Sequence, residues 1–191
     1  MTNFVSETFN NVGDIPAQPT SGSIRATVVR NGAFFRVDIT LDAFALAVTD
    51  AGASGSYGAT ALFNFVEGAF VLTGCRQNYS NLTATSAVTT SNGDAAFKIG
   101  VGTVIKAAAA DGALAGTNDD DVGGEISGTQ ASNALSSPIT LTAGISVAID
   151  GTAAAKSLYL NWSGTAATVD ASGTIYITGT VSFSGVSLSD D

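Results

Sequence analysis

The feature that most constrains this chain is a period-two alternation of apolar and polar residues that recurs along most of its length. In AFFRVDITL (33–41), Phe35, Val37 and Ile39 would point to one side and the intervening residues to the other. That spacing is typical of a β-strand with one buried face, because successive side chains of a strand point to opposite faces. The same alternation returns over 139–149, and no sustained helical period occurs. We therefore expect an all-β fold.

Turn signals separate the expected strands. Asn31 and Gly32 lie between two β-rich segments. An Asn-Gly pair in that position predicts a hairpin, because both residues tolerate positive φ. A second hairpin is predicted where 59–66 and 69–75 meet, across a short Glu-Gly turn.

Two positions interrupt the alternation. After Leu41 the apolar phase moves by one residue, which predicts a bulge or bend at Asp42 and Ala43. Gly144 leaves open whether 139–149 is one long strand or two joined at the glycine. About eight to ten strands with short turns predict an antiparallel β-sandwich or jelly roll, since two such sheets can each bury one face.

The predicted organisation is an N-terminal extended arm, 1–22, followed by one domain, 23–191. The arm is rich in turn residues but carries apolar side chains that would gain by docking on the chain's own sheets or on a partner. A long excursion between strands is expected at about 106–136, where an alanine-rich run predicts a loop or a single helical turn. The apolar arm residues, which are the partner-contact candidates, are Phe4, Val5, Phe9, Val12 and Ile15.

Charge narrows the classes of partner. The net charge is −9 with seven basic residues, which argues against direct binding to nucleic acid. The first residues lack the basic and apolar segments of a secretory leader, and no apolar run approaches the ~20 residues of a membrane helix. We therefore expect synthesis in a cytoplasm and no membrane partner.

The chain has no histidine and one cysteine, which excludes histidine-based catalytic triads and histidine- or cysteine-rich metal sites. Cys75 is expected to be a small buried apolar residue. Asp38, Asp42 and Glu67 are candidates for the carboxylate pair of a glycosidase, but Asp38 is expected to face solvent and Glu67 to lie in a turn. We expect no catalytic residues, no cofactor and no enzymatic activity.

The most unusual segment is TNDDDVGGE (117–125). Its spacing fits an EF-hand loop poorly, and consecutive aspartates point in different directions in most backbones. The first expectation is a solvated acidic turn. A charged contact to a basic partner is one alternative. An irregular Ca²⁺ site is the other, and its ligand candidates are Asp119, Asp120, Asp121 and Glu125.

Two longer segments carry a family resemblance: KIGVGTVIKAAAADGALAGTNDDDVGGEISGTQ and PITLTAGISVAIDGTAAAKSLYLNWSG, followed by the strand DASGTIYITGTV. Together they resemble small all-β structural proteins of tailed-bacteriophage virions, the capsid decoration or cement proteins, over about the whole length.

The resemblance implies a structural virion protein on the capsid surface that binds the major capsid protein and stabilises the shell. It also implies a homo-oligomer, with a trimer favoured by analogy. Two alternatives stay open: a tail or fibre component that binds a receptor, and a non-catalytic carbohydrate-binding module. The module would use Tyr57, Tyr79 or Trp162 as its platform, although Trp162 fits a core position better.

Overall fold

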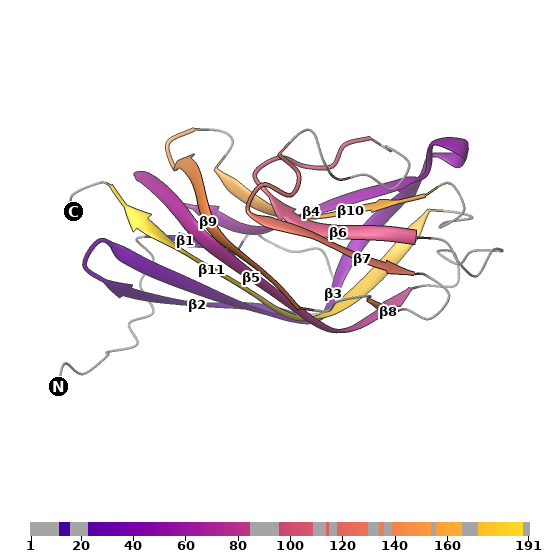
Figure 1. The fold of residues 1–191 in the computed structure, drawn as a ribbon, viewed down its shortest axis with the longest axis horizontal. Helices are drawn as coiled ribbons and strands as arrows, with labels where there is room; N and C mark the ends of the chain where they lie inside the picture. The colour runs from indigo at the N-terminus through magenta and orange to yellow at the C-terminus, as the bar shows by residue number, and fades with distance from the viewer. Residues whose placement is uncertain are drawn as a thin grey trace.

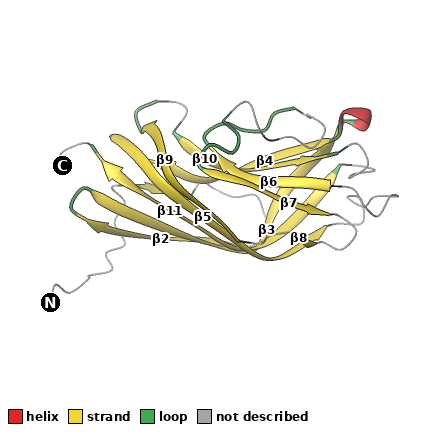
Figure 2. Cartoon of the chain, viewed as in Figure 1, coloured by secondary structure: helices red, strands yellow, loops and turns green. Residues whose placement is uncertain are grey.

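The structure is a computed structural model of the chain. It describes residues 12–15, 23–84, 96–108, 114, 118–129, 134–135, 139–153, 156–165 and 172–188. Most of these lie in antiparallel strands, and the one helical element among them is a 3-10 turn, Gly52–Ser54 (Figure 2). The predicted all-β antiparallel fold is therefore confirmed. The strands are β1 Gly13–Asp14, β2 Ser23–Asn31, β3 Phe34–Asp50, β4 Ser56–Phe65, β5 Ala69–Ala84, β6 Ala96–Gly102, β7 Gly123–Thr129, β8 Ala134–Leu135, β9 Ile139–Asp150, β10 Ser157–Gly164 and β11 Gly173–Ser187.

The strands form one strongly curled sheet (Figure 1), which is not clearly divided into the two sheets of a sandwich. Their order is β8-β7-β6-β10-β4-β3-β11-β5-β9, with β1 added to β4 and β2 added to β3. β3 joins the two halves, because most of it pairs with β2 and β11 while Thr49 and Asp50 pair with β4. The last strand, β11, lies between β3 and β5.

The core fills the inner face of the curl. Phe65 of β4 contacts Phe70 of β5 and Phe183 of β11, with ring centroids 5.2 and 5.8 Å apart. Phe35 and Phe63 extend the same cluster with edge-on contacts. The curl therefore brings strands that are distant in the strand order face to face.

The predicted hairpin over 59–75 is wrong. β4 pairs with β10, β3 and β1, whereas β5 pairs with β11 and β9. The short connection between them crosses from one half of the sheet to the other. The physical reason is that other strands occupy these backbone edges: Phe65 pairs with Gly13 of β1, and Phe70 pairs with Ile149 of β9 and Ser187 of β11. The Phe65 and Phe70 rings then pack against each other across the core.

Other local predictions are confirmed. β2 and β3 form a hairpin through Gly32, whose φ is 60°. A bulge lies at Asp42 and Ala43, which together oppose Thr178; Ala43 has a φ of 47° and its N–H donates to the Thr178 hydroxyl at 3.1 Å. β9 is one long strand, with a register shift near Gly144.

The predicted arm and excursion overlap with the sheet where the structure describes them. Val12 is fully buried in the core, and the adjacent β1 pairs with β4. The Val66 N–H also donates to the Val12 carbonyl at 3.2 Å. Within 106–136, β7 adds to the edge of β6 and β8 adds to β7. Residues 106–108 and 114 of the alanine-rich run are not helical, and the rest of that run lies outside the described residues.

Candidate functional site

The acidic segment packs against the outer face of β6 and β10. On the inner face of these strands, Trp162 stacks on Phe97 with ring centroids 4.2 Å apart. On the opposite face, Asn161 and Ser163 are also fully buried. Described residues that follow β6 and others that precede β7 lie over this face, where Val104, Lys106 and Asp119 contact Asn161 (Figure 1). A polar layer is therefore enclosed between the sheet and this segment, which we call the covering segment (residues 103–122, as far as they are described).

Asn161 is the central residue of the polar layer. Its Oδ1 accepts a hydrogen bond from the Lys106 N–H at 2.9 Å. Its Nδ2 donates to the Val104 carbonyl at 2.9 Å and to the Asp119 carbonyl at 2.7 Å. One strand side chain thus satisfies three backbone groups at the two ends of the covering segment, as buried peptide groups require.

Two glycines of β6 permit the close approach. A Cβ at Gly102 would lie 2.4 Å from the Asn118 carbonyl oxygen. A Cβ at Gly100 would lie 3.0 Å from Cβ of Asp120 and 3.1 Å from Cδ1 of the buried Leu114. A side chain at Gly102 would push the covering segment off the sheet, since real Cβ atoms do not approach other atoms so closely.

Asp119 and Lys106 form an ion pair inside the polar layer. The Lys106 Nζ lies 3.0 Å from Oδ2 of Asp119, and the two side chains are 7% and 0% exposed. Neither carboxylate oxygen of Asp119 accepts a hydrogen bond within the described part of the chain. The distance and the missing hydrogen bond together mean that the two groups touch without the alignment of a hydrogen-bonded pair.

The other acidic side chains of the segment point elsewhere. Asp121 accepts two hydrogen bonds from Thr103, from the backbone N–H and from the hydroxyl, both at 2.8 Å. Glu125 pairs with Lys98 of the neighbouring strand at 2.7 Å. The first contact joins the two ends of the covering segment, and the second joins β7 to β6.

Asp120 is only partly buried. Its pKa is raised from the usual 3.8, first by desolvation and then by the negative charges of Asp119, Glu125 and Asp121. A carboxyl group among other carboxylates without a cation of its own favours its neutral form.

These contacts correct the expectation of a solvated acidic turn, because Asp119 is fully buried and Asp121 accepts hydrogen bonds from Thr103, the residue after β6. Across the described ranges, no three His, Cys, Asp or Glu residues lie close enough together to hold a metal ion. Of the four Ca²⁺ ligand candidates, Asp119, Asp121 and Glu125 contact three different residues.

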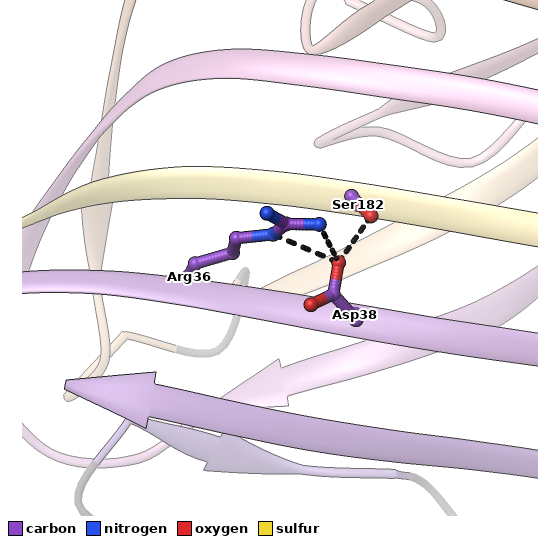
Figure 3. A network of polar contacts seen from close by, with 3 residues as sticks. All are labelled: Arg36, Asp38 and Ser182. Carbon is purple, nitrogen blue, oxygen red and sulfur yellow. Dashed lines mark hydrogen bonds and ion pairs between the residues drawn. The ribbon is translucent and has the colours of Figure 1, made fainter. Parts of the chain in front are cut away.

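The carboxylates weighed for a glycosidase lie apart from this layer. Asp38, on the outer face of β3, accepts hydrogen bonds from Arg36 at 2.8 and 2.9 Å and from the Ser182 hydroxyl (Figure 3). Asp42 lies at the bulge, where it accepts a hydrogen bond from Ser23 at 3.4 Å, and Glu67 is exposed in the turn after β4. The expected positions of Asp38 and Glu67 agree with the structure.

Cys75 and its neighbours form a second buried polar group, on the inner face of β5. Burial raises the pKa of the Cys75 thiol to about 12, and it raises the pKa of Tyr79 well above its usual range. The Tyr79 hydroxyl donates to Gln77 at 2.7 Å, and the Gln77 amide donates to the Gly124 carbonyl of β7 at 2.8 Å. This chain of hydrogen bonds ties β5 to β7 across the curl, and the expectation of a buried Cys75 is confirmed.

The remaining candidates, for a carbohydrate platform and for partner contact, differ in how far they are buried. Tyr79 and Trp162 are core residues, so they cannot form a carbohydrate platform, and Tyr57 is only partly exposed. Val12 is buried in its own chain and cannot meet a partner, while Ile15 is partly buried. Phe4, Val5 and Phe9 lie outside the described residues.

The sequence reasoning missed Asn161, Lys106 and Ser163. A signal for Asn161 was present, because an asparagine within the apolar run LYLNW predicts a buried amide that needs partners. No signal of comparable strength marks Lys106.

The part of the chain that the structure describes contains no helix long and apolar enough to cross a membrane. No protein-family model, no curated protein and no solved structure matches the chain. Its function must therefore be argued from its own residues.

Proposed function

We propose that this chain is a non-enzymatic structural protein of a tailed-phage virion, which binds the major capsid protein at the capsid surface and stabilises the shell. The observation that carries the proposal is the set of contacts that the carboxylates of the acidic segment make within the chain. This segment was the best candidate for a reactive or ion-binding site, yet Asp119 and Asp121 contact Lys106 and Thr103 at the other end of the covering segment, and Glu125 joins β7 to β6 through Lys98. Ion pairs and hydrogen bonds of this kind make the fold rigid, and a shell-stabilising protein needs a rigid fold.

The outer face of β2, β3, β11 and β5 supports a protein-binding role. Cross-strand register places Thr27, Asp38, Ser182 and Arg76 in one row across it. At one end of this face, Phe34 is 66% exposed and Leu188 is 62% exposed. Large exposed apolar side chains beside polar ones are typical of a protein contact surface.

The edge position of β2 supports self-association. Among the described strands, β2 (Ser23–Asn31) pairs with β3 alone, so it lies at an edge of the described sheet. Such an edge pairs readily with a strand of another chain. We propose a homo-oligomer, with the trimer resting on the family resemblance alone.

The curled sheet also fits the proposed architecture. We regard it as a variant of the predicted sandwich or jelly roll, because β4 packs face to face with β5 and β11 through Phe65. A compact fold of this kind presents the outer face of β2, β3, β11 and β5 to a partner.

The test is quantitative mass spectrometry of purified phage particles from a host that expresses the chain. A copy number comparable to that of the major capsid protein supports a decoration role. A few copies per particle would favour the tail or fibre alternative, and absence from intact particles would overturn the proposal. Light scattering after size-exclusion chromatography tests self-association separately, and a strict monomer at all concentrations would contradict it.

A further inference from the structure

The Lys106–Asp119 contact differs from the other ion pairs that the structure describes. In Arg36–Asp38 and Lys98–Glu125, the nitrogen donates a hydrogen bond to the carboxylate at 2.8 and 2.7 Å, and the side chains are one-third exposed or more. Lys106 and Asp119 are buried, and their 3.0 Å contact is not a hydrogen bond. The two groups are therefore as close as an ion pair but lack the hydrogen bond that usually stabilises one.

Two opposite charges in this position are costly. Removing an ammonium and a carboxylate from water is repaid only when the geometry is good and further hydrogen bonds satisfy both groups. Asp119 has no hydrogen bond to its carboxylate oxygens from the described residues. A proton moving from Nζ to the carboxylate would remove both charges and leave a neutral amine next to a neutral carboxylic acid.

We propose that Lys106 and Asp119 condense to an intramolecular amide, so that the mature chain carries an isopeptide cross-link between the two side chains. The Lys106 Nζ lone pair attacks Cγ of Asp119, and a new N–C bond forms. One carboxyl C–O bond then breaks, and that oxygen leaves as water with the carboxyl proton and one amine proton. No oxidant, reductant or co-reactant is needed, because the sum of the step is amine plus acid giving amide plus water.

The surroundings favour this step in two ways. Asn161 holds the backbone of both residues, through the Lys106 N–H at 2.9 Å and the Asp119 carbonyl at 2.7 Å. Groups held in reacting contact behave as if at very high effective concentration. The complete burial of Asp119 also keeps bulk water from the bond, which favours condensation over hydrolysis. Asn161 is thus a positioning residue for the cross-link.

The experiment is mass analysis of the purified full-length protein, followed by digestion with trypsin after denaturation. Trypsin cuts after free lysine but not after an amidated one. Without the cross-link, residues 99–156 are released as two peptides, 99–106 and 107–156. With it, they stay together as one peptide, lighter than its sequence mass by one water molecule.

Variants distinguish the Lys106–Asp119 cross-link from other modifications that lower the mass of the protein. Lys106→Arg keeps the charge but should restore the full sequence mass, whereas Lys98→Arg, at the exposed pair with Glu125, should keep the deficit. Asn161→Ala should lower the cross-linked fraction several-fold, because it releases the backbone of both residues.

Other outcomes overturn the proposal. Normal cleavage after Lys106 at full mass means that the pair is only ionic. Loss of water with normal cleavage after Lys106 points to a succinimide at an Asp-Gly sequence. Loss of ammonia with blocked cleavage points to Asn161 as the acceptor. The wild-type digest decides among these cases even where a variant does not fold.

Discussion

The side-chain amide of Asn161, on β10, donates a 2.7 Å hydrogen bond to the backbone carbonyl of Asp119 in the covering segment. The two residues are 42 positions apart in sequence and both are fully buried. A single strand residue therefore fixes where the acidic segment lies.

Asn161→Ala should destabilise the fold by about 3 kcal/mol, because three buried backbone groups lose their partner and each unsatisfied group costs about 1–3 kcal/mol before relaxation. Chemical denaturation measures the change. Thr27→Ala, at an exposed position on β2, is the matched control and should change stability by less than about 0.5 kcal/mol. Equal effects of the two substitutions would show that the polar layer is not stabilising.

Asp120→Asn should stabilise the protein at neutral pH and have no effect at very low pH. The pKa of Asp120 is raised in the folded state, so the folded chain binds more protons than the unfolded chain above the usual value of 3.8. Stability from this residue is therefore lost as pH rises from about 3.8 through the folded pKa. Melting temperatures of both proteins between pH 3 and pH 7 measure the difference.

Asp150→Asn is the control, because its effect on stability at neutral pH should have the opposite sign to that of Asp120→Asn. Hydrogen bonds from the Thr152 hydroxyl and backbone N–H lower the pKa of Asp150. The stability that Asp150 contributes is present above pH 3.8 and is lost as pH falls through the folded pKa. The substitution should therefore destabilise the protein at pH 7. The same pH profile for both variants would contradict the assigned environments.

Cys75 should resist thiol reagents in the native protein. With a pKa of about 12 against an ordinary 9.0, the reactive thiolate at pH 8 is depleted about 1,000-fold, and burial further limits access. Alkylation followed by mass spectrometry should show slow labelling that becomes fast in denaturant. Rapid native labelling would mean that β5 and β7 separate readily in solution.

Gly102→Ala should cost about 2–3 kcal/mol, since the added Cβ would lie 2.4 Å from the backbone of Asn118 and overpacking typically costs 1–3 kcal/mol. Gly32→Ala is an informative comparison. That position has open space but a φ of 60°, so only backbone strain of about 1 kcal/mol is expected there. A larger effect at Gly32 than at Gly102 would contradict tight packing of the covering segment.

Local features of the fold could be predicted because they depend on neighbouring residues. The phase shift after Leu41 located the bulge at Asp42 and Ala43, and the Asn-Gly pair located the first hairpin. The connection after Phe65 was misjudged, because a two-residue turn between β segments does not reveal whether the strands pair or face each other across a core.

The polar layer depends on distant residues, which explains why it was not predicted. Lys106, Asp119 and Asn161 meet only after β6 and β10 have paired and the chain has folded back over them. Nothing in the local sequence around Asp119 distinguishes a buried aspartate from its exposed neighbours.

The central position of β11 has a consequence for synthesis. β11 contains the last described residues of any strand, yet it lies between β3 and β5 and pairs with both along most of its length. While β11 is still inside the ribosome, β3 and β5 have no strand to join them, and the backbone edges that face β11 stay open. We therefore expect these two strands to be joined only once β11 has emerged, and until then to rely on chaperones or rapid closure to avoid joining a neighbouring nascent chain.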